Sequence, residues 1–122
     1  MHMLTLEEKT QAVITALEDI KAVNITVIDT SKLSSMFARM VIASANSPRQ
    51  TRALASHLAK ELKLLGAEVL GTEGEESGEW VLVDLDEVIV HIMQPAVRAY
   101  YRLEELWDKQ YKPRIPVPRS AP

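Results

Sequence analysis

The stretch Met40-Val-Ile-Ala-Ser-Ala-Asn-Ser-Pro-Arg-Gln50 contains the clearest structural boundary of the chain. Its first four residues form a short apolar run, which is typical of a buried strand. Ser47 then supplies a hydroxyl at an N-cap, Pro48 follows at the first helical position, and Gln50 stands at the third. The stretch therefore predicts a strand that leads directly into a helix.

The helix that starts after Ser47 is predicted to end at Gly66, because glycine readily adopts the backbone conformation found just past a helix. Its apolar stripe consists of four leucines: Leu54, Leu58, Leu62 and Leu65. Residues 68–71 are predicted as a short strand. A strand, a helix and a strand with short connections predict a parallel pair joined by a right-handed crossover.

The residues before this unit predict another helix and another strand. Thr5 and Glu8 have the spacing of a capping box, and apolar residues recur on one stripe over residues 5–22. Residues 24–30 have the β-branched content of a strand. The N-terminal quarter is therefore predicted to be a helix followed by a strand.

The residues after the unit predict a hairpin. Residues 80–83 and 88–93 are apolar on both faces, which favours a central position in the sheet. With Leu85 and Asp86 as the two loop residues, Trp80 pairs with His91 and Leu82 with Ile89. This register remains a hypothesis, because a tight turn prefers glycine where Asp86 stands.

A last helix is predicted from Pro95 to about Trp107. The fold class is α/β: a single layer of about five mixed strands with helices packed on it. We expect one domain over residues 1–107. Residues 108–122 contain four of the six prolines, and we expect them to form a basic tail without fixed structure.

The composition excludes several classes of protein. The chain has 122 residues, a formal net charge of −3 and no cysteine, so disulfides and thiolate metal sites are impossible. The negative balance argues against a domain that coats nucleic acid, and we expect little direct nucleic-acid binding. No apolar run approaches the roughly 18 residues of a membrane span, and no secretory signal is evident, so we expect a cytoplasmic protein.

Asp84 and Asp86 are the best enzymatic candidates. Two carboxylates at this spacing can share a magnesium ion, as nucleotidyl transfer requires, so a magnesium-dependent nucleotidyltransferase is the alternative function. A solvated turn explains the same residues, because no phosphate-binding Gly-Ser loop precedes them and no third carboxylate stands out. We therefore assign no catalytic residue.

The three histidines do not have the spacing of a metal site. His2, His57 and His91 are scattered, and neither His-x-His nor His-Glu-x-x-His occurs. His91 lies in an apolar strand, where a hydrogen-bonded core imidazole is the usual explanation. We expect neither a metal nor another cofactor.

Leu85 indicates a binding surface, because an apolar side chain at the tip of an acidic hairpin buries nothing unless a partner covers it. Residue types that dominate protein interfaces lie nearby, with Trp80 on the same hairpin and Tyr100, Tyr101 and Trp107 on the last helix. A partner-binding patch is the preferred interpretation. The alternatives are aromatic residues that simply fill the core, and a patch that buries against a second copy in a homodimer.

Several motifs occur together in one register between residues 5 and 107. They are Ser-Pro-Arg-Gln (47–50), Gly-Thr-Glu-Gly (71–74), Gly-Glu-Trp-Val-Leu-Val-Asp-Leu (78–85), Val-Ile-Val-His-Ile-Met (88–93) and Arg-Ala-Tyr-Tyr-Arg-Leu-Glu-Glu-Leu-Trp (98–107). Together they resemble the ribosomal silencing factor family, also called Iojap-like. The block from Trp80 to Trp107 is the most specific part.

The resemblance implies a fold related to nucleotidyltransferases but without their catalytic site. It also implies a translational repressor that binds the large ribosomal subunit through its protein fourteen. Such a repressor sterically blocks joining of the small subunit and slows translation when nutrients are limited. The contact residues implied are Trp80, Leu85, Tyr101 and Tyr100.

The chain departs from the family pattern at a few positions. Ala38-Arg39-Met40 replaces a stretch that usually includes an aspartate, Ala45 replaces a glycine, and Asp86-Glu87 replaces Gly-Asp after the hairpin leucine. The last change adds charge beside the implied contact. None of the changes affects Trp80, Leu85 or Tyr101.

Overall fold

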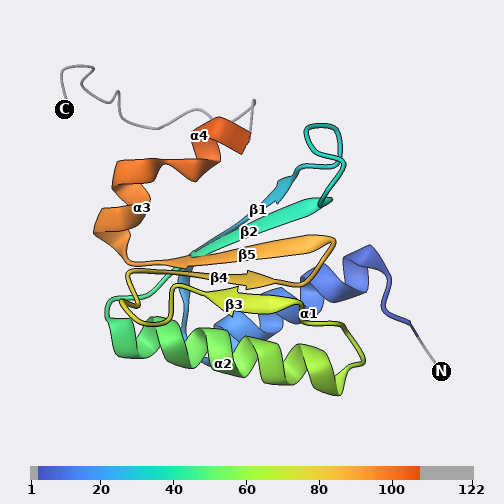
Figure 1. The fold of residues 1–122 in the computed structure, drawn as a ribbon, viewed down its shortest axis with the longest axis horizontal. Coiled ribbons are helices and arrows are strands. Elements are labelled where there is room, and N and C mark those ends of the chain that lie inside the picture. The colour runs from blue at the N-terminus through green and yellow to red at the C-terminus, as the bar shows by residue number, and fades with distance from the viewer. Residues whose placement is uncertain (1–2, 108–122) are drawn as a thin grey trace.

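The computed structural model describes residues 3–107, and the tail expected at 108–122 lies outside the described residues. The elements are α1 (Leu6–Asp19), β1 (Val23–Asp29), β2 (Arg39–Ser44), α2 (Pro48–Leu64), β3 (Gly71–Glu73), β4 (Trp80–Asp84), β5 (Val88–Met93), α3 (Pro95–Tyr101) and α4 (Leu103–Trp107). The five strands form one sheet in the order β1-β2-β5-β4-β3 (Figure 1). Only β2 and β5 are parallel neighbours, so the predicted α/β fold with a mixed sheet is confirmed.

The capping box at α1 is present. The Thr5 hydroxyl accepts a hydrogen bond from the Glu8 amide at 3.1 Å, and the Glu8 carboxylate accepts one from the Thr5 amide at 2.9 Å. The helix ends at Asp19, three residues earlier than predicted. Lys21 has a φ of 61°, and this left-handed backbone is incompatible with a continuing helix.

The predicted start of α2 is also confirmed. The Ser47 hydroxyl accepts a hydrogen bond from the Gln50 amide at 3.1 Å, and Pro48 is the first helical residue. Leu54, Leu58 and Leu62 are fully buried, as their stripe predicted. Leu65 lies past the end of α2 and is 51% exposed, so its predicted place in the stripe was wrong.

The strand predicted at residues 68–71 forms instead at Gly71–Glu73. It does not pair with β2, so the predicted parallel pair was wrong. β3 is antiparallel to β4 at the edge of the sheet, and the parallel partner of β2 is β5. The physical reason is burial: β5 is apolar on both faces and belongs in the middle, whereas the short, exposed β3 suits an edge.

The hairpin between β4 and β5 has a different register from the one predicted. Trp80 faces Met93 and Leu82 faces His91. The turn is formed by Asp86 and Glu87, because the Leu85 amide donates to the Val88 carbonyl at 3.0 Å. Leu85 belongs to the core, so the turn moves to the two charged residues that follow it.

The last helix is interrupted. Arg102 has a φ of 50° and separates α3 from α4, so the single helix predicted from Pro95 to Trp107 was wrong. The break turns α4 so that Leu103 and Trp107 join an apolar cluster with Phe37. The rings of Phe37 and Trp107 lie 5.2 Å apart.

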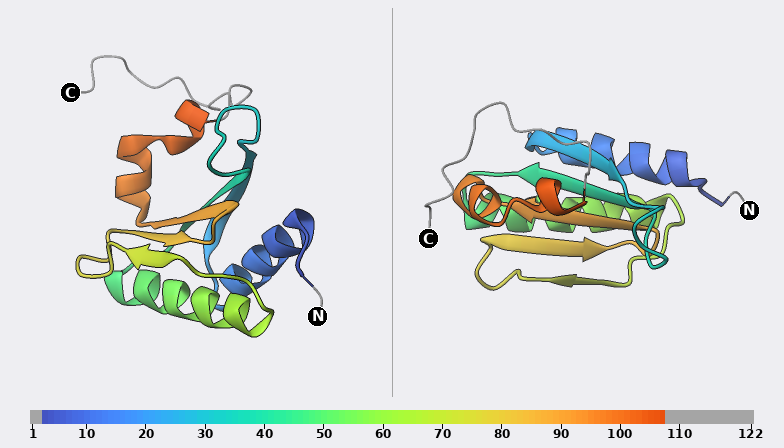
Figure 2. Two further views of the ribbon diagram at one scale, coloured as in Figure 1. Left: turned by 45° about the vertical axis from the view of Figure 1, so that its right-hand side comes forward. Right: turned by 90° about the horizontal axis from the view of Figure 1, so that it is seen from above.

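The helices form two layers on opposite sides of the sheet. Figure 2 shows α1 and α2 on one side and α3 with α4 on the other. The larger core lies under α1 and α2, where their leucines pack on strand residues such as Val41, Val83 and Val90. A smaller cluster, including Ile42 and Met93, lies under α3 and α4. Within the described range, no helix is long and apolar enough to cross a membrane.

Candidate functional site

Trp80 is the central residue of the candidate site. It begins β4, and its side chain lies on the sheet face that carries α3 and α4, where it is partly buried. The indole Nε1 donates a hydrogen bond to His91 Nδ1 at 2.9 Å. The indole ring also packs at 4.9 Å from the ring of Tyr101, so Trp80 is held from two directions.

Two tyrosines at the end of α3 extend this surface outward. Tyr101 is 51% exposed and Tyr100 is 72% exposed. Their rings lie 5.1 Å apart in an edge-to-face arrangement, which is favourable for aromatic pairs. Trp80, Tyr100 and Tyr101 therefore form one continuous surface, which we call the aromatic patch.

Leu85 does not belong to the aromatic patch. Its side chain is fully buried in the core under α1 and α2, so the prediction that it is exposed at the hairpin tip was wrong. It follows Trp80 by an odd number of positions, and successive side chains of a strand point to opposite faces. Trp80 and Leu85 therefore lie on opposite faces of the sheet. This alternation was visible in the sequence.

His91 is the core imidazole that the sequence predicted. It is 6% exposed, and burial lowers its pKa from 6.5 to about 4. It is therefore uncharged at neutral pH. Because the Trp80 N–H can only donate, Nδ1 must be the acceptor, and the imidazole proton lies on Nε2.

Arg98 attaches α3 to the rest of the molecule, a role that the sequence did not reveal. Its guanidinium bonds the Glu104 carboxylate at 2.6 Å, the Asn24 carbonyl at 2.6 Å, and the hydroxyls of Ser44 and Thr26 at 3.0 Å each. Every residue of α3 keeps some exposure, so apolar burial alone holds this helix weakly. The arginine network compensates by joining α3 to β1, β2 and α4.

Leu82 and Ile89 are further apolar residues on the same sheet face. They were not predicted from the sequence to belong to a binding surface. Both are partly exposed. Leu82 is two positions after Trp80, and Ile89 is two positions before His91, so strand alternation was the signal that places them there. They extend the apolar surface from the aromatic patch along β4 and β5.

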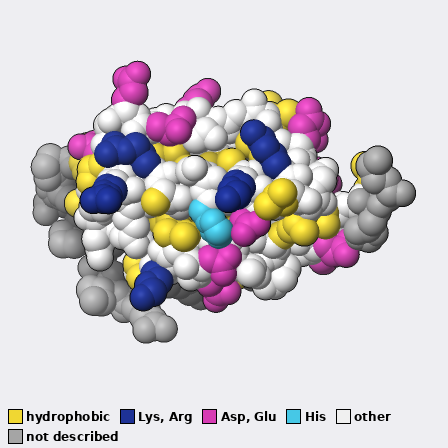
Figure 3. All heavy atoms as spheres, turned by 90° about the horizontal axis from the view of Figure 1, so that it is seen from below, with side chains coloured by type: hydrophobic (Ala, Val, Ile, Leu, Met, Phe, Trp, Pro, Cys, Tyr) yellow, Lys and Arg dark blue, Asp and Glu magenta, His cyan; other side chains and the backbone are white. Residues whose placement is uncertain are grey.

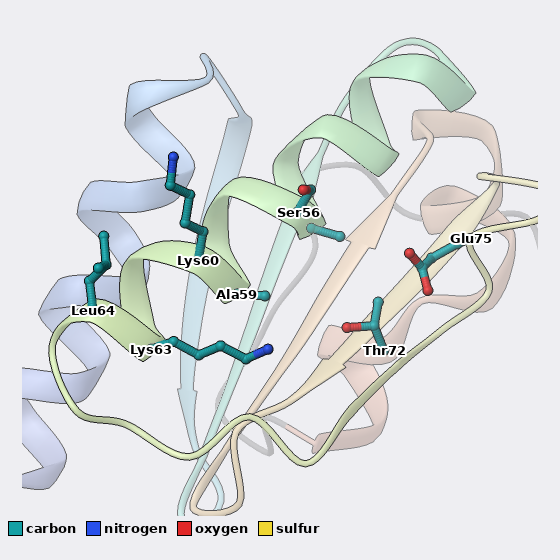
Figure 4. Close-up of a pocket in the computed structure, with 8 residues that line it drawn as sticks. Ser56, Ala59, Lys60, Lys63, Leu64, Thr72 and Glu75 are labelled. Atoms are coloured by element: carbon teal, nitrogen blue, oxygen red, sulfur yellow. The ribbon is translucent and has the colours of Figure 1, made fainter.

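An open groove of about 570 Å³ lies elsewhere, between α2 and β3 (Figure 4). Lys60 and Lys63 line it on the helix side, and Thr72 and Glu75 line it on the strand side. Thr72 pairs with Val83, whose side chain belongs to the core under α2, so the groove is on the opposite face of the sheet from the aromatic patch.

A family model described as ribosomal silencing factor during starvation matches residues 4–122. A Chromobacterium violaceum protein named ribosomal silencing factor RsfS is 49% identical over 119 residues, covering 98% of this chain and 97% of that protein. The chain belongs to the ribosomal silencing factor (RsfS) family.

Other relatives agree with this assignment. The RsfS of Haemophilus influenzae is 41% identical over 91 residues, covering 75% of this chain and 89% of that protein. A crystal structure of a Chromobacterium violaceum protein matches with a TM-score of 0.86 at 48% identity, covering 96% of this chain and 97% of that chain. The family match also includes residues 108–122, beyond the motifs quoted from the sequence.

Members of the RsfS family bind the large ribosomal subunit and block subunit joining under starvation, without catalysing a reaction. Membership of this non-enzymatic family excludes the nucleotidyltransferase alternative. The structure agrees, because Asp84 uses its carboxylate to accept the Asp86 amide at 2.9 Å and so builds the turn. Among the described residues, Asp84 and Asp86 belong to no cluster of three metal-binding side chains.

Proposed function

We propose that this RsfS protein docks on protein fourteen of the large ribosomal subunit through its aromatic patch. Bound there, its body occupies the space that the small subunit needs. The observation that supports this is the exposure of Tyr100 and Tyr101 beside a partly buried Trp80. Tryptophan and tyrosine are enriched among residues that dominate binding energy.

The aromatic patch is prepared for binding before a partner arrives. His91 orients the Trp80 indole, and the Arg98 network holds the helix that carries the tyrosines. Ordering side chains on association costs roughly 0.5–1.5 kcal/mol each, so a surface that is already ordered binds more tightly.

Acidic residues lie next to the apolar surface. Glu73 pairs with Leu82 across β3 and β4, and Glu79 directly precedes Trp80; both carboxylates are exposed. Such charges steer a basic partner and speed its association. The proposed partner is accordingly a basic ribosomal protein, met in the cytoplasm where ribosomes work.

Leu85 supports this surface indirectly in our proposal. Its side chain packs with α1 and α2, and the Lys9 ammonium bonds its carbonyl at 3.4 Å. It fixes the hairpin from the opposite face and does not contact the ribosome itself.

Co-sedimentation with purified large subunits tests the proposed surface. We expect Trp80→Ala and Tyr101→Ala each to weaken binding by about 2 kcal/mol or more, the range of interface hot spots. Leu64→Ala is the matched control, because Leu64 is 72% exposed on the opposite face, on α2. Unchanged binding of both aromatic variants would contradict the assignment.

Three further measurements address the mechanism, the partner and the oligomeric state. In a subunit-joining assay, wild-type protein is expected to reduce formation of complete ribosomes in proportion to its occupancy of large subunits. A crosslinkable side chain introduced at Tyr100 is expected to label protein fourteen. Light scattering of the free protein distinguishes an accessible patch from one covered by a second copy: a dimer that Tyr101→Ala dissociates would support the homodimer instead.

A further inference from the structure

The fold brings together one nitrogen and two carboxylate ligands from two helices. His57 Nε2 lies 3.1 Å from Asp19 Oδ2 and 3.8 Å from Glu61 Oε1. Ligand atoms of all three residues lie within 4.8 Å of one another. We propose that Asp19, His57 and Glu61 bind a divalent transition-metal ion of the zinc type.

The separations suit a tetrahedral ion. Zinc bonds to nitrogen and oxygen are about 2.0–2.2 Å long, so neighbouring ligands of a tetrahedral ion lie about 3.3–3.6 Å apart. The two distances from His57 bracket that range. The third separation, between the two carboxylate oxygens, is at most 4.8 Å, so the side chains must rotate to bring all three atoms around one ion. Water completes the shell.

The donor set also selects the ion. Calcium and magnesium prefer oxygen ligands alone, whereas an imidazole with carboxylates suits zinc and its neighbours in the periodic table. The two carboxylates balance the two positive charges of the ion. The side chains of His57, Asp19 and Glu61 are 24%, 49% and 39% exposed, so an ion can enter from solvent.

The backbone already holds the three residues in place. His57 and Glu61 are one turn apart on the same side of α2, and Asp19 is the last residue of α1. The face that carries both helices shows a histidine bordered by acidic side chains (Figure 3). A bound ion would cross-link the end of α1 to α2 and stabilise the fold.

Sequence spacing alone did not indicate this three-residue site, because Asp19 is on a different helix from the other two ligands. The site is also independent of the proposed ribosome contact. It lies on the exposed surface of α1 and α2, whereas the aromatic patch lies on the opposite face of the sheet. Failure of either proposal leaves the other untouched.

The test is calorimetric titration of tag-free, full-length protein with ZnCl2 after removal of metals by a chelator. We expect saturable binding of one zinc ion per chain and a rise in Tm with added zinc, because a ligand that binds only the folded state stabilises it. Equal concentrations of MgCl2 are expected to leave Tm unchanged.

Variants separate this site from adventitious binding. Losing an outer-shell partner typically costs roughly 10–100-fold in metal affinity, so His57→Ala and Glu61→Gln are expected to cost at least that much. His2→Ala is the matched control, because it removes an imidazole outside the cluster, and it is expected to bind zinc as wild type does. Circular dichroism confirms that each variant is folded. Absence of zinc binding, or equal affinity in wild type and His57→Ala, would overturn the proposal and leave His57 and Asp19 as a hydrogen-bonded pair between helices.

Discussion

The Trp80 indole donates its only N–H to His91 Nδ1 at 2.9 Å, and the two rings lie 5.7 Å apart. One residue of the proposed contact surface is thus oriented by a buried imidazole on the neighbouring strand. The bond exists only while Nδ1 carries no proton, which couples the orientation of Trp80 to the protonation of His91.

This coupling predicts a loss of stability in mild acid. The pKa of His91 is 6.5 when unfolded and about 4 in the buried site, so between these values the unfolded chain binds the extra proton. The free energy of unfolding therefore falls as pH drops from 6.5 towards 4, by about 3 kcal/mol at roughly 1.4 kcal/mol per pH unit. Urea denaturation from pH 7 to 4 measures this loss.

The control for that experiment is His91→Gln, which removes the titrating group while the carboxylates shared with the wild type still titrate. We expect the variant to lose less stability over the same interval. Equal losses in the two proteins would show that His91 does not govern the acid response.

Leu85→Ala is expected to destabilise the fold. Deleting a buried leucine side chain typically costs 2–5 kcal/mol, because transfer energy is lost and a cavity remains. This cost applies in full to Leu85, because its side chain is completely buried. Chemical denaturation measures the change.

At a temperature where Leu85→Ala remains folded, its affinity for large subunits should stay within a few-fold of wild type. Leu106→Ala serves as the control for stability, because Leu106 is 70% exposed. A Leu85 variant that keeps full stability but loses binding would contradict the buried position.

Asp86→Gly is expected to stabilise the hairpin. Asp86 has a φ of 72°, a conformation that costs a residue with a side chain roughly 1 kcal/mol and costs glycine much less. The Asp86 amide still reaches the Asp84 carboxylate after the change, because that bond uses the backbone. A rise in the urea midpoint is expected for Asp86→Gly, and no rise for Asp86→Ala.

Arg98→Ala is expected to loosen α3. The side chains of Arg98 and Glu104 are 13% and 12% exposed, and removing one partner leaves the other charge poorly solvated. We expect a loss of about 2 kcal/mol in the protection of α3 amides from hydrogen exchange, together with weaker binding to large subunits.

Arg102→Ala is the matched control for that variant. The Arg102 side chain is 37% exposed, and its guanidinium lies 3.9 Å from the Glu105 carboxylate. Surface pairs of this kind contribute about 0–1 kcal/mol, so little change is expected. Equal hydrogen-exchange protection of the α3 amides in the Arg98→Ala and Arg102→Ala variants would show that the Arg98 network has no special role.

Local features of the fold followed from the sequence. The structure shows the predicted caps at Thr5 and Ser47 and the end of α2 before Gly66. It also buries three of the four predicted leucines of the α2 stripe, all except Leu65. These features depend on hydrogen bonds and side-chain periodicity within a few residues, so the chain encodes them locally. The exposure of Tyr101 was also anticipated, from residue type and from the family resemblance.

Tertiary structure alone decided the rest. The structure alone places β3 at the edge of the sheet, links Arg98 to Asn24 and brings Asp19 beside His57. Each of these arrangements depends on segments that are far apart in the chain. Such contacts depend on which apolar faces become buried in the interior of the fold. Burial depends on the packing of all helices and strands together, so no short stretch of sequence determines it.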